Sequence, residues 1–163
     1  MRKESRLLLD KSVSSLILSI EQFNRPFDFG RTESVLMFLD HSFEMFLKSA
    51  ILHRGGKIRE KRAKQTIGFD PCVRKALSDG NIKFLTKEQA LTLQVINNLR
   101  DAAQHHLLDL SEQLLYIHTQ SGVTLFKDLL KTVFGSDLYK LLPRRVLPVS
   151  SVPITDILDF CVF

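Results

Sequence analysis

The segment 32–53 constrains the fold of this 163-residue chain more than any other. Its apolar residues recur at helical spacing on most sides of the predicted helix: Val35, Leu36, Phe38, Leu39, Phe43, Phe46, Leu47, Ala50 and Ile51. A surface helix needs only one apolar stripe, whereas a helix that is apolar on most sides must be covered by its neighbours. This segment therefore predicts the central helix of a helical bundle.

Four further helices are expected from apolar periodicity and from the residues that begin and end helices. They cover about 5–23, 70–80, 86–107 and 109–134. The end signals are Thr86 with Gln89 in a capping box, Asp70 as N-cap before Pro71, Asp109 with Glu112 in a second capping box, and Gly135 as a terminator. No segment alternates convincingly as a strand does. The expected fold is all-α, an up-and-down bundle of about four to five helices.

The last 21 residues differ from the rest of the chain. Pro143, Pro148 and Pro153 punctuate them, which predicts an extended tail over 143–163 after a bundle over 1–142. The run 157–163 is apolar apart from Asp159 and has no polar end. We expect a truncation before a further domain, or a tail that is buried in a partner.

Composition narrows the class of protein. A net charge of +5 and a pI near 9.4 favour a polyanionic partner. No signal peptide or membrane span is evident, so a cytoplasmic protein without a membrane partner is expected. Neither Cys72 and Cys161 nor the five histidines have metal-ligand spacing, and no glycine-rich phosphate loop occurs, so no metal or cofactor is expected.

Arg100 and His105 are the strongest candidates for chemistry. They stand about 140° apart around the predicted helix, and both avoid its apolar side. Asp101 lies four residues before His105, where its carboxylate can hydrogen-bond the imidazole, and Gln104 shares the polar face. The pattern fits two interpretations: a solvated face with an ordinary ion pair, or a site that acts on phosphate.

The stretch 98–105 resembles the Arg-polar-x-x-x-His motif of the HEPN superfamily of all-helical domains. Two other regions resemble an uncharacterised HEPN-like family of bacterial, defence-associated proteins. The first is 29–34 leading into 44–50, and the second is 146–150, after the helical core. Together the resemblance covers about 8–151.

This resemblance implies a metal-independent endoribonuclease of the toxin or phage-defence type, in which the RNA 2′-hydroxyl attacks the phosphate. Arg100 would stabilise the phosphorane and His105 would act as general base or acid. It also implies a homodimer with a composite cleft, with an inhibitory antitoxin or a further C-terminal domain as additional partners. The alternative is a non-catalytic HEPN-type dimerisation or adaptor module.

Other residues have two interpretations each. Glu44 and Lys48 form an i,i+4 ion pair, or Glu44 supports Arg100 or His105. His106 is a core or interface histidine, or it supports catalysis and replaces His105 if the motif is one residue longer. A basic run forms either a solvated loop or an RNA-binding loop; it contains Arg54, Lys57, Arg59, Lys61, Arg62 and Lys64.

Overall fold

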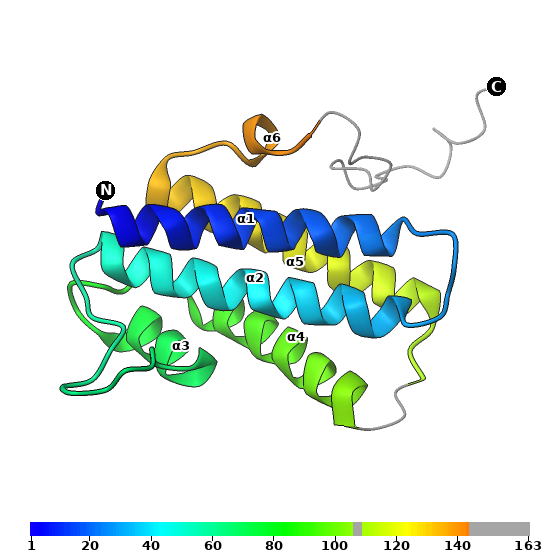
Figure 1. Ribbon diagram of the computed structural model, residues 1–163, viewed down its shortest axis with the longest axis horizontal. Helices are drawn as coiled ribbons and strands as arrows, with labels where there is room; N and C mark the ends of the chain where they lie inside the picture. Colours follow the sequence, from blue (N-terminus) through cyan, green and yellow to red (C-terminus); the bar gives the residue numbers. More distant parts are fainter. Residues whose placement is uncertain (106–108, 144–163) are drawn as a thin grey trace.

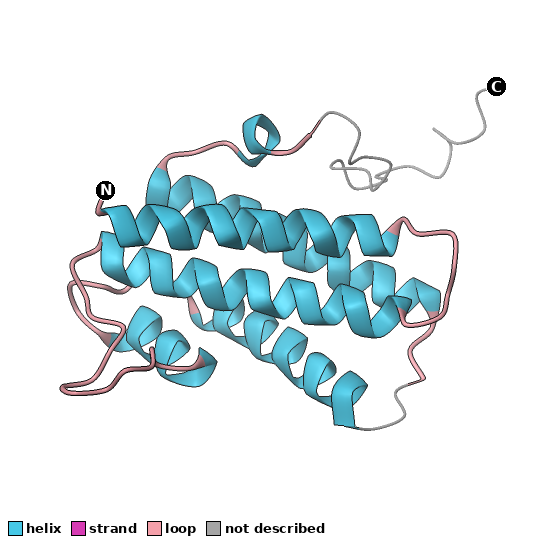
Figure 2. Ribbon diagram, in the orientation of Figure 1, coloured by secondary structure: helices cyan, strands magenta, loops and turns pink. Residues whose placement is uncertain are grey.

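The computed structural model describes residues 1–105 and 109–143. Within these ranges the chain forms six helices and no strand (Figures 1 and 2): α1 Lys3–Phe23, α2 Arg31–His53, α3 Phe69–Ser78, α4 Lys87–His105, α5 Glu112–Phe134 and the short α6 Leu138–Leu141. None of these helices combines the length and the apolar character that crossing a bilayer requires. The all-α helical bundle predicted from the sequence is confirmed. The proposed tail lies almost entirely outside the described residues.

Helix α2 lies at the centre of the bundle, as its apolar pattern predicts. It contacts α1, α3, α4 and α5 (Figure 1). Phe43 and Phe46 are fully buried and pack on Phe126 of α5, with ring centroids 5.7 and 5.1 Å apart. Aromatic pairs at this separation stabilise a core beyond the area they bury. Because α2 is covered on several sides, its buried polar side chains must find partners inside the protein.

A ladder of serines joins α1 to α2. Ser5, Ser12 and Ser19 are spaced seven residues apart and are 0% exposed. Each Oγ donates to a main-chain carbonyl of α2 over 2.8 to 2.9 Å; the acceptors, in order, are Ser49, Ser42 and Val35. These acceptors are also seven residues apart, as expected for two antiparallel helices that pack with a coiled-coil repeat. The small side chains of this serine ladder allow the two backbones to approach closely.

Helices α3 and α5 start close to the predicted positions, but in each a different residue from the predicted one is the N-cap. Gly68, rather than Asp70, is the N-cap of α3, and Asp70 and Pro71 lie in its first turn. Proline is tolerated there because the first N–H groups of a helix have no intrahelical acceptor. Ser111, rather than Asp109, caps α5: its Oγ accepts a hydrogen bond from the N–H of Leu114 over 3.3 Å.

A tertiary contact explains why Asp109 and Glu112 do not form the predicted capping box at the start of α5. Glu112 does not fold back on its own helix but accepts a hydrogen bond from Arg31 Nη2 over 3.0 Å. Its carboxylate therefore ties the start of α5 to the start of α2. The capping box at Thr86 and Gln89 is confirmed, with reciprocal hydrogen bonds of 3.0 and 3.2 Å.

Gly135 ends α5 in a left-handed conformation with φ of 65°, and its N–H donates to the carbonyl of Lys131. Gly135→Ala is expected to lower the free energy of unfolding by about 1 kcal/mol, because a Cβ is disfavoured at positive φ. Gly80→Ala is the control. Gly80 is not among the glycines with positive φ, and none of the described atoms lies within 4 Å of its added Cβ. Urea denaturation that shows equal losses for the two variants would contradict this assignment.

Candidate functional site

Arg100 on α4 is anchored to α2 by Asp40. Its Nε donates to Asp40 Oδ2 over 3.0 Å, and Asn97 Nδ2 donates to Asp40 Oδ1 over 2.9 Å. The Asp40 side chain is only 5% exposed. Burial raises the pKa of this carboxyl above its ordinary value, while the hydrogen bonds from Asn97 and Arg100 act in the opposite direction. Both Asp40 oxygens thus hold groups of α4 in fixed positions.

The rest of the Arg100 guanidinium faces the polar side of α4. Nη1 donates to Gln104 Oε1 over 3.1 Å and lies 2.8 Å from Asp101 Oδ1. In the described part of the chain no side chain bonds Nη2, and the Arg100 side chain is 25% exposed. A guanidinium has five N–H donors in a fixed plane. Nε and Nη1 therefore position the group, and Nη2 keeps two donors for an anion.

A shallow hollow lies beside Arg100, between α2 and α4. Its lining residues are Met37, Asp40, His41, Glu44, Arg100 and Gln104. We call it the Arg100 hollow. It contains an imidazole, two carboxyl groups and a guanidinium, and therefore brings proton-transferring and charge-stabilising groups to one place.

Glu44 lies in this hollow but does not hold Arg100. Lys48 Nζ donates to Glu44 Oε1 over 2.5 Å, and the Lys48 side chain is only 6% exposed. The i,i+4 ion pair predicted for these two residues is confirmed. The hypothesis that Glu44 anchors Arg100 is wrong, because Asp40, one helical turn earlier on α2, takes that role.

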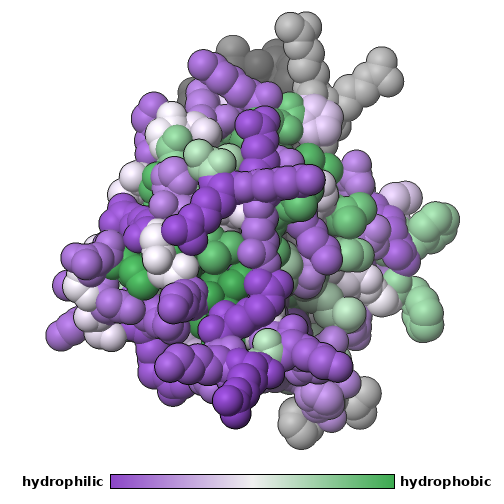
Figure 3. Space-filling model, turned by 60° about the vertical axis from the view of Figure 1, so that its left-hand side comes forward, coloured by the Kyte–Doolittle hydropathy of each residue, from purple (hydrophilic) through white to green (hydrophobic). Residues whose placement is uncertain are grey.

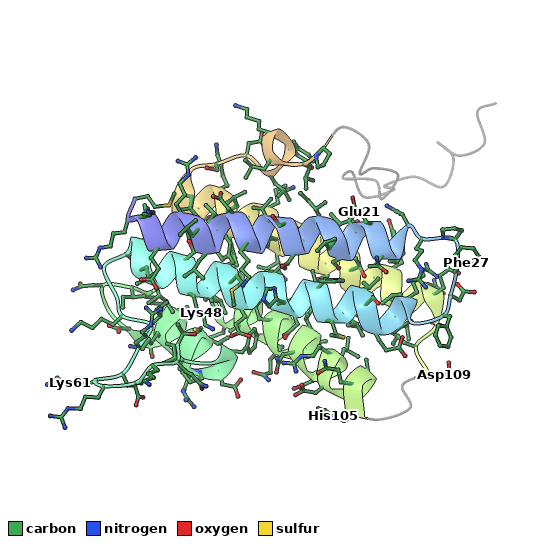
Figure 4. The ribbon with its side chains drawn as sticks, viewed as in Figure 1. Glu21, Phe27, Lys48, Lys61, His105 and Asp109 are labelled. Atoms are coloured by element: carbon green, nitrogen blue, oxygen red, sulfur yellow. The ribbon has the colours of Figure 1, made fainter. Side chains whose placement is uncertain are left out.

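His105 borders a different depression. That depression is lined by Asn98, Asp101, Ala102 and His105. His105 is exposed at the end of α4 (Figure 4). Among the described residues, the expected hydrogen bond from the His105 imidazole to the Asp101 carboxylate is not formed, because that carboxylate pairs with Arg100 instead. Arg100 and His105 of one chain thus open into neighbouring depressions, in agreement with their separation around the helix. His106 lies outside the described residues.

The basic run forms the loop between α2 and α3. Two of its arginines are engaged: Arg54 Nη1 donates to the Lys83 carbonyl over 2.8 Å, and Arg59 pairs with Glu4 over 2.6 Å. Its other cations are exposed, namely Lys57, Lys61, Arg62 and Lys64. Hydrophilic side chains cover most of the surface seen from this end (Figure 3). Lys61 and His105 lie toward opposite ends of the molecule (Figure 4), so the loop and the motif are separate features.

Three residues of the site were missed from the sequence: Asp40, His41 as a lining residue, and Asn97 as a partner. A signal for Asp40 existed. On α2 it lies next to His41 and one helical turn before Glu44, so these polar residues gather on one side of a mostly buried helix. A carboxylate on such a helix requires a buried donor.

Cys72, the cysteine that lies within the described residues, shows no reactive character. Cys72 is buried, and burial raises the pKa of its thiol to about 12. A thiol of this kind stays protonated and is a poor nucleophile. Among the described residues, no three His, Cys, Asp or Glu side chains gather as metal ligands would. Cys161 lies outside the described residues.

A family model described as "Domain of unknown function (DUF3644)" matches residues 7–156. Comparisons with curated proteins and with solved structures found no match.

Proposed function

Since this chain belongs to the DUF3644 family, whose description assigns no function, we propose its function from its own residues: endonucleolytic cleavage of RNA without a metal ion. The observation that supports this most strongly is the anchoring of Arg100. Asp40 and Gln104 hold Nε and Nη1, while Nη2 keeps its donors on a partly exposed surface. A pre-positioned guanidinium suits the stabilisation of charge on a phosphorane.

The reaction requires no nucleophile from the protein. The 2′-hydroxyl of RNA attacks the adjacent phosphorus, the P–O5′ bond breaks, and the products carry a 2′,3′-cyclic phosphate and a 5′-hydroxyl. His105 takes part as a general acid or base, because an imidazole can give or take a proton at neutral pH. DNA lacks the attacking hydroxyl and is expected to resist cleavage. Single-stranded RNA is the expected substrate, since in-line geometry is harder to reach in a duplex.

We extend the proposal to a homodimer in which two motif helices face each other. Arg100 and His105 of one chain line neighbouring depressions. A second copy would add another Arg100 and His105 and build one composite cleft. A cytoplasmic role in toxicity or phage defence, with an inhibitory antitoxin or a further domain as partner, belongs to the same proposal and rests on the HEPN resemblance.

The exposed cations of the α2–α3 loop would guide the RNA backbone. Lys61 of this loop and His105 of the motif lie well apart (Figure 4). An RNA strand that touches both features must span several nucleotides. Phosphate contacts of this type position a nucleic acid without reading its sequence.

Two observations favour the alternative, a non-catalytic dimerisation or adaptor module. Two carboxylates, Asp40 and Asp101, lie within 3.0 Å of Arg100 nitrogens and neutralise its charge. Phe27 and Phe29 are also 70% and 93% exposed in the α1–α2 loop. Large exposed aromatic side chains are common in protein interfaces.

The decisive test is cleavage of a labelled, mixed-sequence single-stranded RNA in excess EDTA, with DNA of the same sequence beside it. We expect wild-type protein to cut only the RNA and to leave cyclic phosphate ends. Arg100→Ala and His105→Ala should each lower kcat/KM by about 10²- to 10⁴-fold. His118→Ala, a histidine on α5 away from both depressions, is the matched control. Intact RNA with wild-type protein would favour the adaptor.

A further inference from the structure

His41 shares the Arg100 hollow, although it belongs to another helix and is not part of the motif. It follows Asp40 on α2 and lines the hollow together with Glu44 and Arg100. Its Nδ1 lies 2.8 Å from Ser15 Oγ on α1. This contact fixes the orientation of the ring and leaves Nε2 as the nitrogen that can meet a ligand.

Charged groups from three helices surround this imidazole. Lys11 comes from α1, Asp40, Glu44 and Lys48 come from α2, and Arg100 comes from α4.

Burial is the main cause that lowers the pKa of His41 below its ordinary value of 6.5. Lys11 and Lys48 act in the same direction, and Glu44 and Asp40 oppose them. The ring is therefore neutral at neutral pH. When Nδ1–H donates to Ser15 Oγ, Nε2 carries a free lone pair.

We propose that His41 is the general base of the RNA-cleaving site, and that Ser15 is its positioning residue. This inference rests on the proposed function and deepens it. Nε2 of His41 accepts the proton of the 2′-hydroxyl as the 2′-oxygen bonds to phosphorus. The P–O5′ bond breaks, and His105, as the general acid, gives a proton to the departing 5′-oxygen. One proton is taken up and one is delivered, so the step balances.

The geometry favours this division of roles. In-line cleavage needs its base and its acid on opposite sides of the phosphate that Arg100 holds; His41 lines the hollow of Arg100, and His105 lines the adjacent depression. The imidazolium that forms on His41 is stabilised by the nearby Asp40 and Glu44 carboxylates. A base that starts neutral and an acid that starts protonated are the pair that such a reaction needs.

The roles can be separated with two RNA substrates that differ in one atom. The first is an ordinary oligoribonucleotide, and the second carries sulfur in place of the 5′-oxygen at one scissile bond. A thiolate leaves without protonation, so the second substrate does not need a general acid. With the ordinary RNA, His41→Ala and His105→Ala should each lose about 10²-fold or more in kcat/KM. With the sulfur substrate, His105→Ala should recover to near the wild-type rate and His41→Ala should not.

Two further measurements distinguish chemistry from a structural role. Added imidazole should restore part of the activity of His41→Ala. Ser15→Ala should shift the acidic limb of the pH profile of kcat/KM, whereas Ser14→Ala, whose exposed hydroxyl bonds the Asp10 carbonyl, should not. Circular dichroism should show the same helix content for all variants.

The outcomes separate the two proposals. If wild-type protein cleaves RNA but His41→Ala keeps both its rate and its pH profile, the assignment of His41 is overturned and the ribonuclease function stands. Recovery of His41→Ala, rather than His105→Ala, with the sulfur substrate would likewise overturn the assignment, since it would reverse the two roles. Absence of cleavage by wild-type protein would overturn both proposals.

Discussion

Asp40→Asn is expected to lower RNA cleavage by about a hundredfold while leaving the bundle folded. The amide keeps the size of the side chain but offers only one acceptor oxygen to two donors, Asn97 Nδ2 and Arg100 Nε. The Arg100 guanidinium would therefore lose its fixed position, and a shift of about 1 Å at a reacting group costs on the order of 10²-fold in rate. Single-turnover cleavage at saturating RNA would measure the effect.

The stability of this variant offers an independent check. Burial raises the pKa of Asp40, so the native state binds the proton more tightly than the unfolded state does. The contribution of protonated Asp40 to stability is present at low pH and is lost as pH rises through its folded-state pKa. Asp40→Asn cannot titrate and should lack this loss in urea denaturation across that range. Glu33→Gln, on the exposed part of α2, is the control for both measurements. Full RNA cleavage by Asp40→Asn would contradict the role of Asp40 in positioning Arg100.

Ser12→Leu is expected to lower the free energy of unfolding by about 2 to 4 kcal/mol. Ser12 is 0% exposed in the middle of the serine ladder, and its Oγ donates to the Ser42 carbonyl over 2.8 Å. A leucine adds volume where α1 and α2 approach closely, and it removes the hydroxyl. The helices must separate or the leucine must adopt a strained rotamer. Thermal and urea unfolding would both report the loss.

Two variants separate the cost of the lost hydrogen bond from the cost of the added side-chain volume. Ser12→Ala removes only the hydrogen bond and should cost about 0.5 to 1.5 kcal/mol. Ser14→Leu places the same leucine on an exposed position of α1 and should be close to neutral. If Ser12→Leu were no worse than Ser12→Ala, the close approach of the two helices would not depend on small side chains.

Local sequence signals predicted the helices well because helical hydrogen bonds are local. The starts and ends of α1 and α2 and the start of α4 follow from apolar spacing and cap residues, and the Thr86 capping box and the Gly135 terminator formed as predicted. The failures at Asp70 and Asp109 have a different cause. At the start of α3, Phe69 is buried and belongs to the helix, which moves the cap to Gly68. At α5, Glu112 turns to Arg31, a residue 81 positions away.

In the candidate site, too, local sequence signals predict some features and long-range packing decides the others. The sequence alone determined that Arg100 and His105 lie on one helix and avoid its apolar side, because the period of the helix dictates which residues share a face. Only the tertiary structure decided which groups surround them. Asp40 is separated from Asn97 by 57 residues and from Arg100 by 60, and these groups meet because α2 packs against α4. A buried carboxylate must find its donors on a neighbouring element, and no local pattern records which element that will be.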